Sequence, residues 1–334
     1  MLVSIIITSY NYGAYLGEAI ESALNQTYTD VEVIVVDDGS TDNSVEIIKG
    51  YRDRVISILK TNTGQCSCFN TGFDRCHGDL VIFLDADDVL RNNAVELHVA
   101  RMKNPGVVKC SGYMEVIDAH GKPTGGFIPS KLGAAGDYCD VTLKYGLGSY
   151  RQSYTSGNIW SRTFLEKVMP LPENNLSGAD GYLASIDTLF GKIESVHEPV
   201  VSYRIHGKNK GPENFRFNAE YMRNRLRNRN HRIRYAETWI AKLGYQCDTK
   251  EFRKLRDWRI ALMSYTLGLM GEPEGPPASL VELVASPFQR PDYRIIRSAA
   301  VSVFLVLLGT LPRKMAIQIA QYMLENRKHK GPFH

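Results

Sequence analysis

The chain has 334 residues, of which 43% are hydrophobic and 23% are charged, and its formal net charge is +4. This composition is ordinary for a globular protein and does not favour disorder, and the charge is too small to indicate a nucleic-acid partner. The length allows one large α/β domain with a smaller appendage.

Cysteine usage and the start of the chain bear on location. The six cysteines show no metal-ligand spacing, since Cys66 and Cys68 are separated by one residue and the others stand apart. We interpret them as reduced thiols in a cytosolic protein. The start of the chain has no signal-peptide pattern, and no apolar run reaches the length of a membrane span. We expect a protein that is cytoplasmic, or peripheral on the inner face of the plasma membrane.

The first part of the chain alternates between predicted strands and helices. Runs rich in Val and Ile predict strands at residues 2–8, 31–36, 55–59 and 80–85, of which the first and the last are expected to be buried. Apolar residues at helical spacing predict helices at 15–26, around 45–48 and at 64–76. This alternation implies parallel pairing with right-handed crossover connections.

The second part is less regular. Strands are predicted at residues 107–117, 127–128, 154–160 and 194–203, and helices at 93–103, 164–168 and 177–190. Pro199 favours the edge of a sheet, because proline cannot donate to a strand ladder. Residues 131–150 are rich in Gly and Tyr, and they fit either a loop over a substrate site or a plain linker.

Acidic residues follow directly after two of the predicted strands. They are Asp37 and Asp38 after the second strand, and Asp85, Asp87 and Asp88 after the fourth. The carboxyl ends of parallel strands share one side of a sheet, so both groups can face one crevice. Clustered carboxylates repel each other unless a cation joins them, and they suit Mg²⁺ or Mn²⁺, which binds phosphate. The alternative is a strand that ends in a solvated acidic turn.

Two common nucleotide-binding motifs are missing. No Gly-x-Gly-x-x-Gly turn follows the first strand, and the chain has no Gly-Lys-Ser/Thr phosphate loop. Any nucleotide would therefore be held by a metal at its phosphates and by acidic side chains at its base or ribose.

With these motifs in place, the chain resembles glycosyltransferase family 2, whose members use nucleotide sugars and have the GT-A fold. The matching residues are Ser4–Asn11, Ser22–Thr27, Val36–Asp42, Asn62, Gly64, Asn70, Gly78–Asp79 and Leu84–Asp88. The resemblance covers about residues 1–210. It implies an α/β fold with a Rossmann-like, mostly parallel sheet flanked by helices. It places a catalytic domain at 1–215, with a nucleotide-binding half at about 1–105 and an acceptor half at about 106–215.

The resemblance also implies residue roles. Nucleotide-sugar binding is expected from Thr8, Tyr10, Asp38, Asp85, Ala86 and Asp87, and binding of Mn²⁺ or Mg²⁺ from Asp87, Asp88 and His206. Asp180 takes the place of the family's catalytic residue, which deprotonates the acceptor hydroxyl. Three plainer interpretations compete with these roles. Asp180 could be a helix-cap residue, His206 a surface histidine and Tyr10 a packed aromatic residue.

The region at 216–334 lies outside the resemblance, and we expect it to be helical. Arginines crowd one segment between Arg223 and Arg234, and the run Ser298–Leu311 is almost wholly apolar with basic residues on both sides. The pattern fits attachment to a membrane surface. Alternatively, the run packs against a second copy of the chain or on its own catalytic domain.

The expected function is that of a metal-dependent inverting glycosyltransferase. It would move a sugar from a nucleotide-diphosphate donor, a UDP-sugar, to a hydroxyl of a glycan or lipid-linked acceptor in surface polysaccharide or glycolipid synthesis. One alternative is a nucleotidyltransferase, which usually carries a Gly-rich basic loop that Tyr10–Gly13 does not resemble. The other is a non-catalytic nucleotide-binding scaffold, and the intact acidic residues weigh against it.

Overall fold

A computed structural model describes much of the chain. The described residues are 1–51, 53–148, 150–173, 178–207, 209, 218–248, 258–271, 278–285, 305–306 and 308–325. The chain divides into two compact units. The first consists of Met1–Asp140 and Tyr150–His206, and the second of Val141–Ser149 and Gly207–His334. Each unit is described by itself below.

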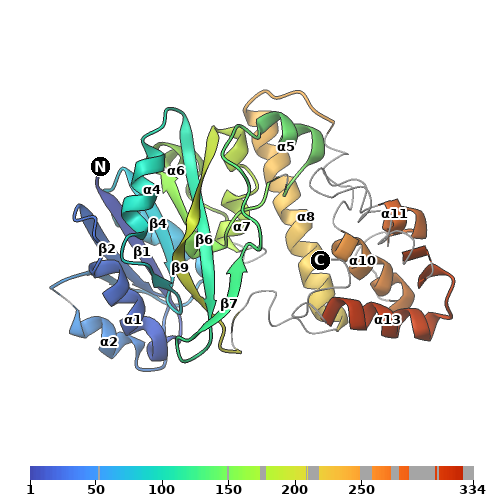
Figure 1. Ribbon diagram of the computed structural model, residues 1–334, viewed down its shortest axis with the longest axis horizontal. Helices are drawn as coiled ribbons and strands as arrows, with labels where there is room; N and C mark the ends of the chain where they lie inside the picture. Colours follow the sequence, from blue (N-terminus) through green and yellow to red (C-terminus); the bar gives the residue numbers. More distant parts are fainter. Residues whose placement is uncertain are drawn as a thin grey trace. The chain divides into compact units, whose positions relative to one another are not determined.

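The first unit contains a sheet whose N-terminal half is parallel, as predicted. Its strands run in the order β3-β2-β1-β4 (Figure 1). They are β1 (Val3–Ser9), β2 (Val31–Asp37), β3 (Ile56–Leu59) and β4 (Leu80–Asp85). The connecting helices are α1 (Gly13–Leu24), α2 (Ser44–Gly50) and α3 (Gln65–Arg75). These bounds lie close to the predicted ones. The apolar runs of β1, β2 and β4 are largely buried, as in strands covered on both faces, whereas β3 is mostly exposed.

The second half of the sheet mixes both strand directions. The order continues from β4 as β8-β6-β9-β5, and β7 pairs with β6 off this path. The strands are β5 (Val89–Leu90), β6 (Val107–Ile117), β7 (Pro123–Ile128), β8 (Asn158–Ser161) and β9 (Lys192–Arg204). β8 is antiparallel to both β4 and β6, whereas β6 and β9 are parallel. The α/β fold prediction is confirmed, with this antiparallel insertion between two parallel groups.

Helices cover both faces of the sheet. On one face, Ile5 of β1 belongs to a core cluster with Ile20 of α1 and Val95 of α4 (Ala94–Met102). On the other face, α3 packs against the sheet, where Phe69 stacks on Phe83 of β4 with ring centroids 3.8 Å apart. Because successive residues of a strand point to opposite faces, β1 and β4 contribute to both layers.

The predicted helix at 177–190 is wrong in its length. The described part of this segment forms α7 (Ala179–Leu183), followed by a 3₁₀ turn, η2 (Asp187–Leu189). Two interactions explain the break. The hydroxyl of Ser185 donates to the carbonyl of Gly181 at 2.5 Å, a bond of the kind that bends helices. Asp187 also forms an ion pair with the buried Lys109.

Three further elements complete the first part of the chain. They are η1 (Thr155–Gly157), α5 (Cys139–Tyr145) and α6 (Arg162–Val168). The predicted strand at 154–160 therefore begins later, at β8, and the segment at 131–150 contains a short helix. The residues of α5 divide between the two units.

Pro199 lies in β9, which has a strand on each side. Its neighbour β5 pairs only with Val201 and Ser202, and the ladder to β6 is irregular where Tyr113 faces Pro199. The prediction that Pro199 lies in an edge strand is therefore wrong, because β9 lies between β6 and β5. Proline is nevertheless tolerated at this position, because β5 does not pair with Pro199 and so needs no N–H from it.

The second unit is helical in its described residues. Its helices are α8 (Ala219–Lys242), α10 (Trp258–Met270), α11 (Leu280–Ala285) and α13 (Arg313–Glu325). They enclose a core that includes Met222, Leu262 and Leu324. Most of the predicted apolar run Ser298–Leu311 lies outside the described residues. Among the helices that are described, none combines the length and the apolar character that a bilayer crossing requires.

One buried histidine should make the fold sensitive to acid. His98 of α4 is buried, and its Nδ1 has no hydrogen-bond partner among the described residues. Burial lowers the pKa of His98 to about 3. In the unfolded chain the same side chain takes up a proton below about pH 6.5.

We therefore expect the wild-type protein to lose stability relative to His98→Leu as the pH falls below 6.5. Only the unfolded state gains the proton in this range, which favours unfolding by about 2 kcal/mol at pH 5. Urea unfolding of both proteins at pH 7 and pH 5 measures the difference. A stability gap that does not change with pH would contradict the prediction.

Candidate functional site

The predicted site residues of the parallel half meet at the carboxyl ends of its strands. Thr8 of β1 pairs with Val36 of β2 on one side and with Asp85 of β4 on the other. The chain then leaves β1 at Tyr10, whose side chain is 41% exposed. This is the crevice at the carboxyl ends of the strands, where ligands bind in open α/β sheets.

Asp38 is buried and surrounded by donors. Its Oδ1 accepts hydrogen bonds from Lys60 Nζ at 2.7 Å and from the N–H of Thr63 at 2.9 Å. Its Oδ2 accepts one from the N–H of Gly64 at 2.8 Å. Burial raises the pKa of Asp38, but Lys60 and the two backbone donors outweigh it, and the net pKa is lowered. The side chain is therefore ionised and held in one orientation.

A tight turn follows Asp38. The carboxylate of Asp37 accepts from the N–H of Ser40 at 2.8 Å and from its hydroxyl at 2.6 Å. Gly39 has a φ of 76°, and a Cβ there would lie 2.9 Å from the backbone nitrogen of Asn62. Glycine is required because other residues would be strained and would collide with that backbone.

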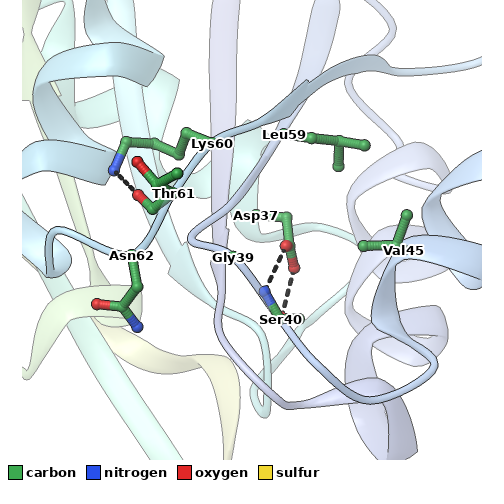
Figure 2. Close-up of a pocket in the computed structure, with 8 residues that line it drawn as sticks. All are labelled: Asp37, Gly39, Ser40, Val45, Leu59, Lys60, Thr61 and Asn62. Carbon is green, nitrogen blue, oxygen red and sulfur yellow. Dashed lines mark hydrogen bonds between the residues drawn. The ribbon is translucent and has the colours of Figure 1, made fainter.

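An open pocket of about 490 Å³ lies beside this turn. It is lined by Asp37, Gly39, Ser40, Val45, Leu59, Lys60, Thr61 and Asn62. Figure 2 shows the Asp37 carboxylate directed at Ser40 and the Lys60 ammonium bonded to Thr61. The predicted nucleotide-binding residues Thr8, Tyr10 and Asp38 are not among the lining residues, so the pocket adjoins their site and does not coincide with it.

The acidic residues after β4 have different surroundings. The Oδ2 of Asp87 lies 2.9 Å from Nε2 of His206. Asp88 is turned inward, where its Oδ2 accepts from the hydroxyl of Ser156 at 2.6 Å and its Oδ1 from the N–H of Arg204 at 3.1 Å. Both oxygens of Asp88 are thus used inside the protein in this conformation, and its role as a metal ligand stays a prediction. Ala86 between the acids is buried.

Repulsion among these carboxylates is strong. Burial raises the pKa of Asp85, and the nearby charges of Asp87 and Asp180 raise it further. Burial likewise raises the pKa of Asp88, followed by the charges of Asp87 and Asp85. A cation placed among them would oppose this repulsion, because a positive charge favours the ionised carboxylates.

His206 is held by aromatic rings as well as by Asp87. Its side chain is 2% exposed, and its ring centroid lies 4.9 Å from that of Tyr15 and 5.7 Å from that of Tyr12. Close by, Arg204 donates through Nε to the backbone carbonyl of Asp87 at 3.0 Å. The interpretation of His206 as a surface histidine is therefore wrong.

Asp180 lies in the first turn of α7 and is half-buried. The residue at the N-cap position is Gly178, so Asp180 is not the cap of this helix. Its Oδ1 accepts from the N–H of Gly181 at 2.7 Å. Because its charge raises the pKa of Asp85, Asp180 belongs to the same electrostatic cluster as the acids after β4.

Sequence reasoning missed several residues of the site. Lys60 neutralises Asp38, and the amide of Gln65 lies 3.3 Å from Oδ1 of Asp85. A basic residue directly after the third predicted strand was a usable signal for Lys60, since that strand end had to lie beside the second. Gln65 had no comparable signal, because its partners come from two distant segments.

A buried ion pair supports the segment that begins with α7. Lys109 of β6 and Asp187 of η2 are both 0% exposed, and Lys109 Nζ lies 3.1 Å from Asp187 Oδ2. The same Nζ donates to the hydroxyl of Tyr150 at 2.9 Å, and it lies 4.5 Å from the ring centroid of Trp160. Burial lowers the pKa of Lys109, and Asp187 opposes this shift.

Comparison with known proteins finds relatives of part of this chain. Residues 4–156 match the model described as "Glycosyl transferase family 2". An uncharacterized glycosyltransferase from Nostoc sp. is 36% identical over 214 residues, which cover 63% of this chain and 66% of the relative. Chondroitin synthase from Escherichia coli is 46% identical over 99 residues, 29% of this chain and 14% of that protein. The chain thus spans less than two thirds of these relatives' own lengths.

Two solved structures show the same fold. TarS of S. aureus, residues 1–349 in complex with UDP, has a TM-score of 0.56 at 18% identity, covering 97% of this chain and 90% of that chain. A mannosyltransferase from Pyrobaculum calidifontis, in complex with GDP-Man and Mn²⁺, has a TM-score of 0.50 at 16% identity, with 97% and 85% covered.

The buried ion pair yields a prediction about stability. Lys109→Met should lower the free energy of unfolding by about 3–5 kcal/mol, because it leaves the Asp187 charge buried without its cation. Replacing both partners, as Lys109→Met with Asp187→Leu, should recover part of the loss. Urea unfolding followed by circular dichroism measures both, with the exposed Lys192→Met of β9 as the matched control. Equal unfolding midpoints for Lys109→Met and the control would contradict the prediction.

Proposed function

We propose that this chain, which belongs to glycosyl transferase family 2 through residues 4–156, transfers a sugar from a nucleotide-diphosphate donor to an acceptor hydroxyl. Relatives named as glycosyltransferases support an enzyme of this class. The observation that carries the proposal is the convergence of Asp85, Asp87 and Asp180 in one electrostatic cluster. Thr8, Tyr10 and Asp38, the residues that the family resemblance assigns to nucleotide binding, also lie at or just after the carboxyl ends of the parallel strands.

The donor would bind at the carboxyl ends of β1, β2 and β4. Thr8 and Tyr10 would contact the base and ribose, with the exposed ring of Tyr10 available for stacking. Asp38 is ionised, and a carboxylate oxygen can accept more than one hydrogen bond, so it can still accept an N–H of the base. We propose a UDP-sugar, with support from the TarS structures with UDP and UDP-GlcNAc. Because the Pyrobaculum mannosyltransferase binds GDP-Man, guanine nucleotides should be tested beside uridine nucleotides.

The residues present fit a divalent cation. Asp85 and Asp87 offer carboxylate oxygens, and His206 offers an imidazole beside Asp87, a donor set suited to Mn²⁺ or Mg²⁺. Among the described residues, His, Cys, Asp and Glu form no cluster of three that would hold a metal alone. That is expected of ions that are bound by one or two carboxylates together with substrate phosphates. Such an ion would supply positive charge at the leaving diphosphate.

In this mechanism, Asp180 accepts the proton of the acceptor hydroxyl as that oxygen attacks the anomeric carbon. The bond from the anomeric carbon to the diphosphate oxygen breaks on the opposite face. A single displacement of this kind inverts the anomeric configuration, whereas a double displacement needs a second carboxylate as nucleophile. His206, which is held beside Asp87 and the two tyrosine rings, would help to hold the cation at the leaving diphosphate.

The acceptor would be a glycan or a lipid-linked sugar in surface polysaccharide or glycolipid synthesis. The partial match to chondroitin synthase supports a polysaccharide. The cytoplasmic location stays a prediction, as does contact with a membrane or a second copy through the C-terminal region. No observation on the described residues favours the nucleotidyltransferase or scaffold alternatives.

Nucleotide binding should depend on a divalent cation, because Asp85 and Asp87 would otherwise repel the diphosphate. A thermal-shift screen of UDP, GDP and their sugars, with and without Mn²⁺, identifies the nucleotide through ligand-induced stabilisation. Calorimetry with that nucleotide then compares Mn²⁺ with EDTA. Equal affinity in both conditions would rule out the metal role.

Asp180→Asn should abolish sugar transfer and leave donor binding nearly unchanged. A base that acts on the acceptor affects kcat far more than donor affinity, and general-base removal typically costs about 10²- to 10⁴-fold. Nucleotide release from the donor sugar measures turnover, and calorimetry measures binding. Asp74→Asn, an exposed aspartate of α3 with the same charge change, is the control. Loss of donor binding in folded Asp180→Asn would instead place this residue at the nucleotide.

A further inference from the structure

Gln65 is the first residue of α3, and its side-chain amide touches two separate segments. Its Nε2 donates to Oδ1 of Asp85 at 3.3 Å, and its Oε1 accepts from the N–H of Ala179 at 3.2 Å. Ala179 is the first residue of α7 and directly precedes Asp180. A single planar group thus joins the acidic end of β4 to the start of the helix that carries the proposed base.

The residues before Gln65 contact the nucleotide side of the site. The N–H groups of Thr63 and Gly64 both donate to Asp38. Residues 63–65 therefore contact Asp38, Asp85 and Ala179 in succession.

A second amide of α3 binds the chain before α7. Asn70 donates to the carbonyl of Leu171 at 2.9 Å and to the carboxylate of Glu173 at 2.8 Å, and it accepts from the N–H of Leu171 at 2.7 Å. Beyond α7, the chain is held again by the ion pair of Asp187 with Lys109. The segment with Asp180 is thus anchored on either side, and Gln65 is the anchor that also touches a proposed donor-binding residue.

We propose that Gln65 is a positioning residue that transmits the occupancy of the donor site to Asp180. The inference rests on the proposed function and adds a coupling between its two halves. When a ligand at Asp85 turns that carboxylate, the amide of Gln65 must follow, and its oxygen moves relative to Ala179. An amide suits this role because it donates at one end and accepts at the other. Lysine could not accept from Ala179, and a glutamate would repel Asp85.

Amide hydrogen exchange of the peptide around 178–184 tests the coupling without an acceptor or a known sugar. In the wild-type protein, UDP with Mn²⁺ should slow exchange in this peptide. In Gln65→Met, which removes both contacts, exchange should be about fivefold faster, as expected for one lost hydrogen bond. UDP with Mn²⁺ should then leave the rate unchanged, while calorimetry still detects UDP binding.

Gln65→Glu separates the two contacts. Its carboxylate oxygen still accepts from Ala179, so the rate without ligand should stay near that of the wild-type protein. Its charge faces Asp85, so the response to UDP should be lost. This variant also keeps the test decisive if Gln65→Met does not fold.

Gln26→Met is the matched control. Gln26 is a buried amide that joins two segments, since it donates to the carbonyl of Arg91 at 2.9 Å and accepts from the N–H of Val95 at 3.1 Å. Its loss should destabilise the protein but preserve the response of the 178–184 peptide to UDP. If Gln65→Met or Gln65→Glu responds to UDP as this control does, the coupling is refuted and the proposed function stands. If the wild-type protein binds neither UDP nor GDP with Mn²⁺, the proposed function is refuted together with the coupling.

Discussion

The site depends on the concentration of negative charge at the carboxyl ends of the parallel strands. Parallel strands bring their carboxyl ends together, and here several of those ends carry aspartates that are largely shielded from water. Each is stabilised differently. Asp38 is neutralised by Lys60 and backbone N–H groups, whereas Asp88 is bonded to Ser156 and Arg204 inside the protein. Asp85 and Asp88 both keep a raised pKa, so the protein alone does not resolve the repulsion among the aspartates after β4.

This distribution separates structural acids from reactive ones. Both oxygens of Asp88 accept hydrogen bonds inside the protein, so Asp88 holds the chain in place although its pKa is also raised, and we assign contact with a ligand to Asp85. Sequence position alone does not distinguish the two, since Asp85 and Asp88 belong to the same short motif. Their difference arises from Ser156 and Arg204, which lie far along the chain and donate to the carboxylate oxygens of Asp88.

Much of the fold could be predicted, because its strongest signals are local. The apolar runs at β1, β2 and β4 and the helical spacing of α1 identified those elements, and the spaced motifs identified the family. The order of β8, β6 and β9 in the sheet could not be read in this way, since antiparallel and parallel neighbours have similar apolar patterns. The interruption after α7 depends on Lys109, a residue of a distant strand. The partners Lys60 and Gln65 were missed because hydrogen bonding across a fold leaves no periodic pattern.

The use of backbone donors around the acids has a consequence for sequence drift. The N–H groups of Thr63 and Arg204 hold Asp38 and Asp88, and a backbone donor survives any substitution at its own residue except proline. A substitution at Thr63 therefore keeps this N–H on Asp38, although it removes the hydroxyl that accepts from Lys60 Nζ. Lys60 and Ser156 act through their side chains and have no such freedom. Divergent copies of this chain should thus vary more readily at Thr63 than at Lys60 or Ser156, whereas the side chain of Arg204 has contacts of its own with Asp87 and Glu18.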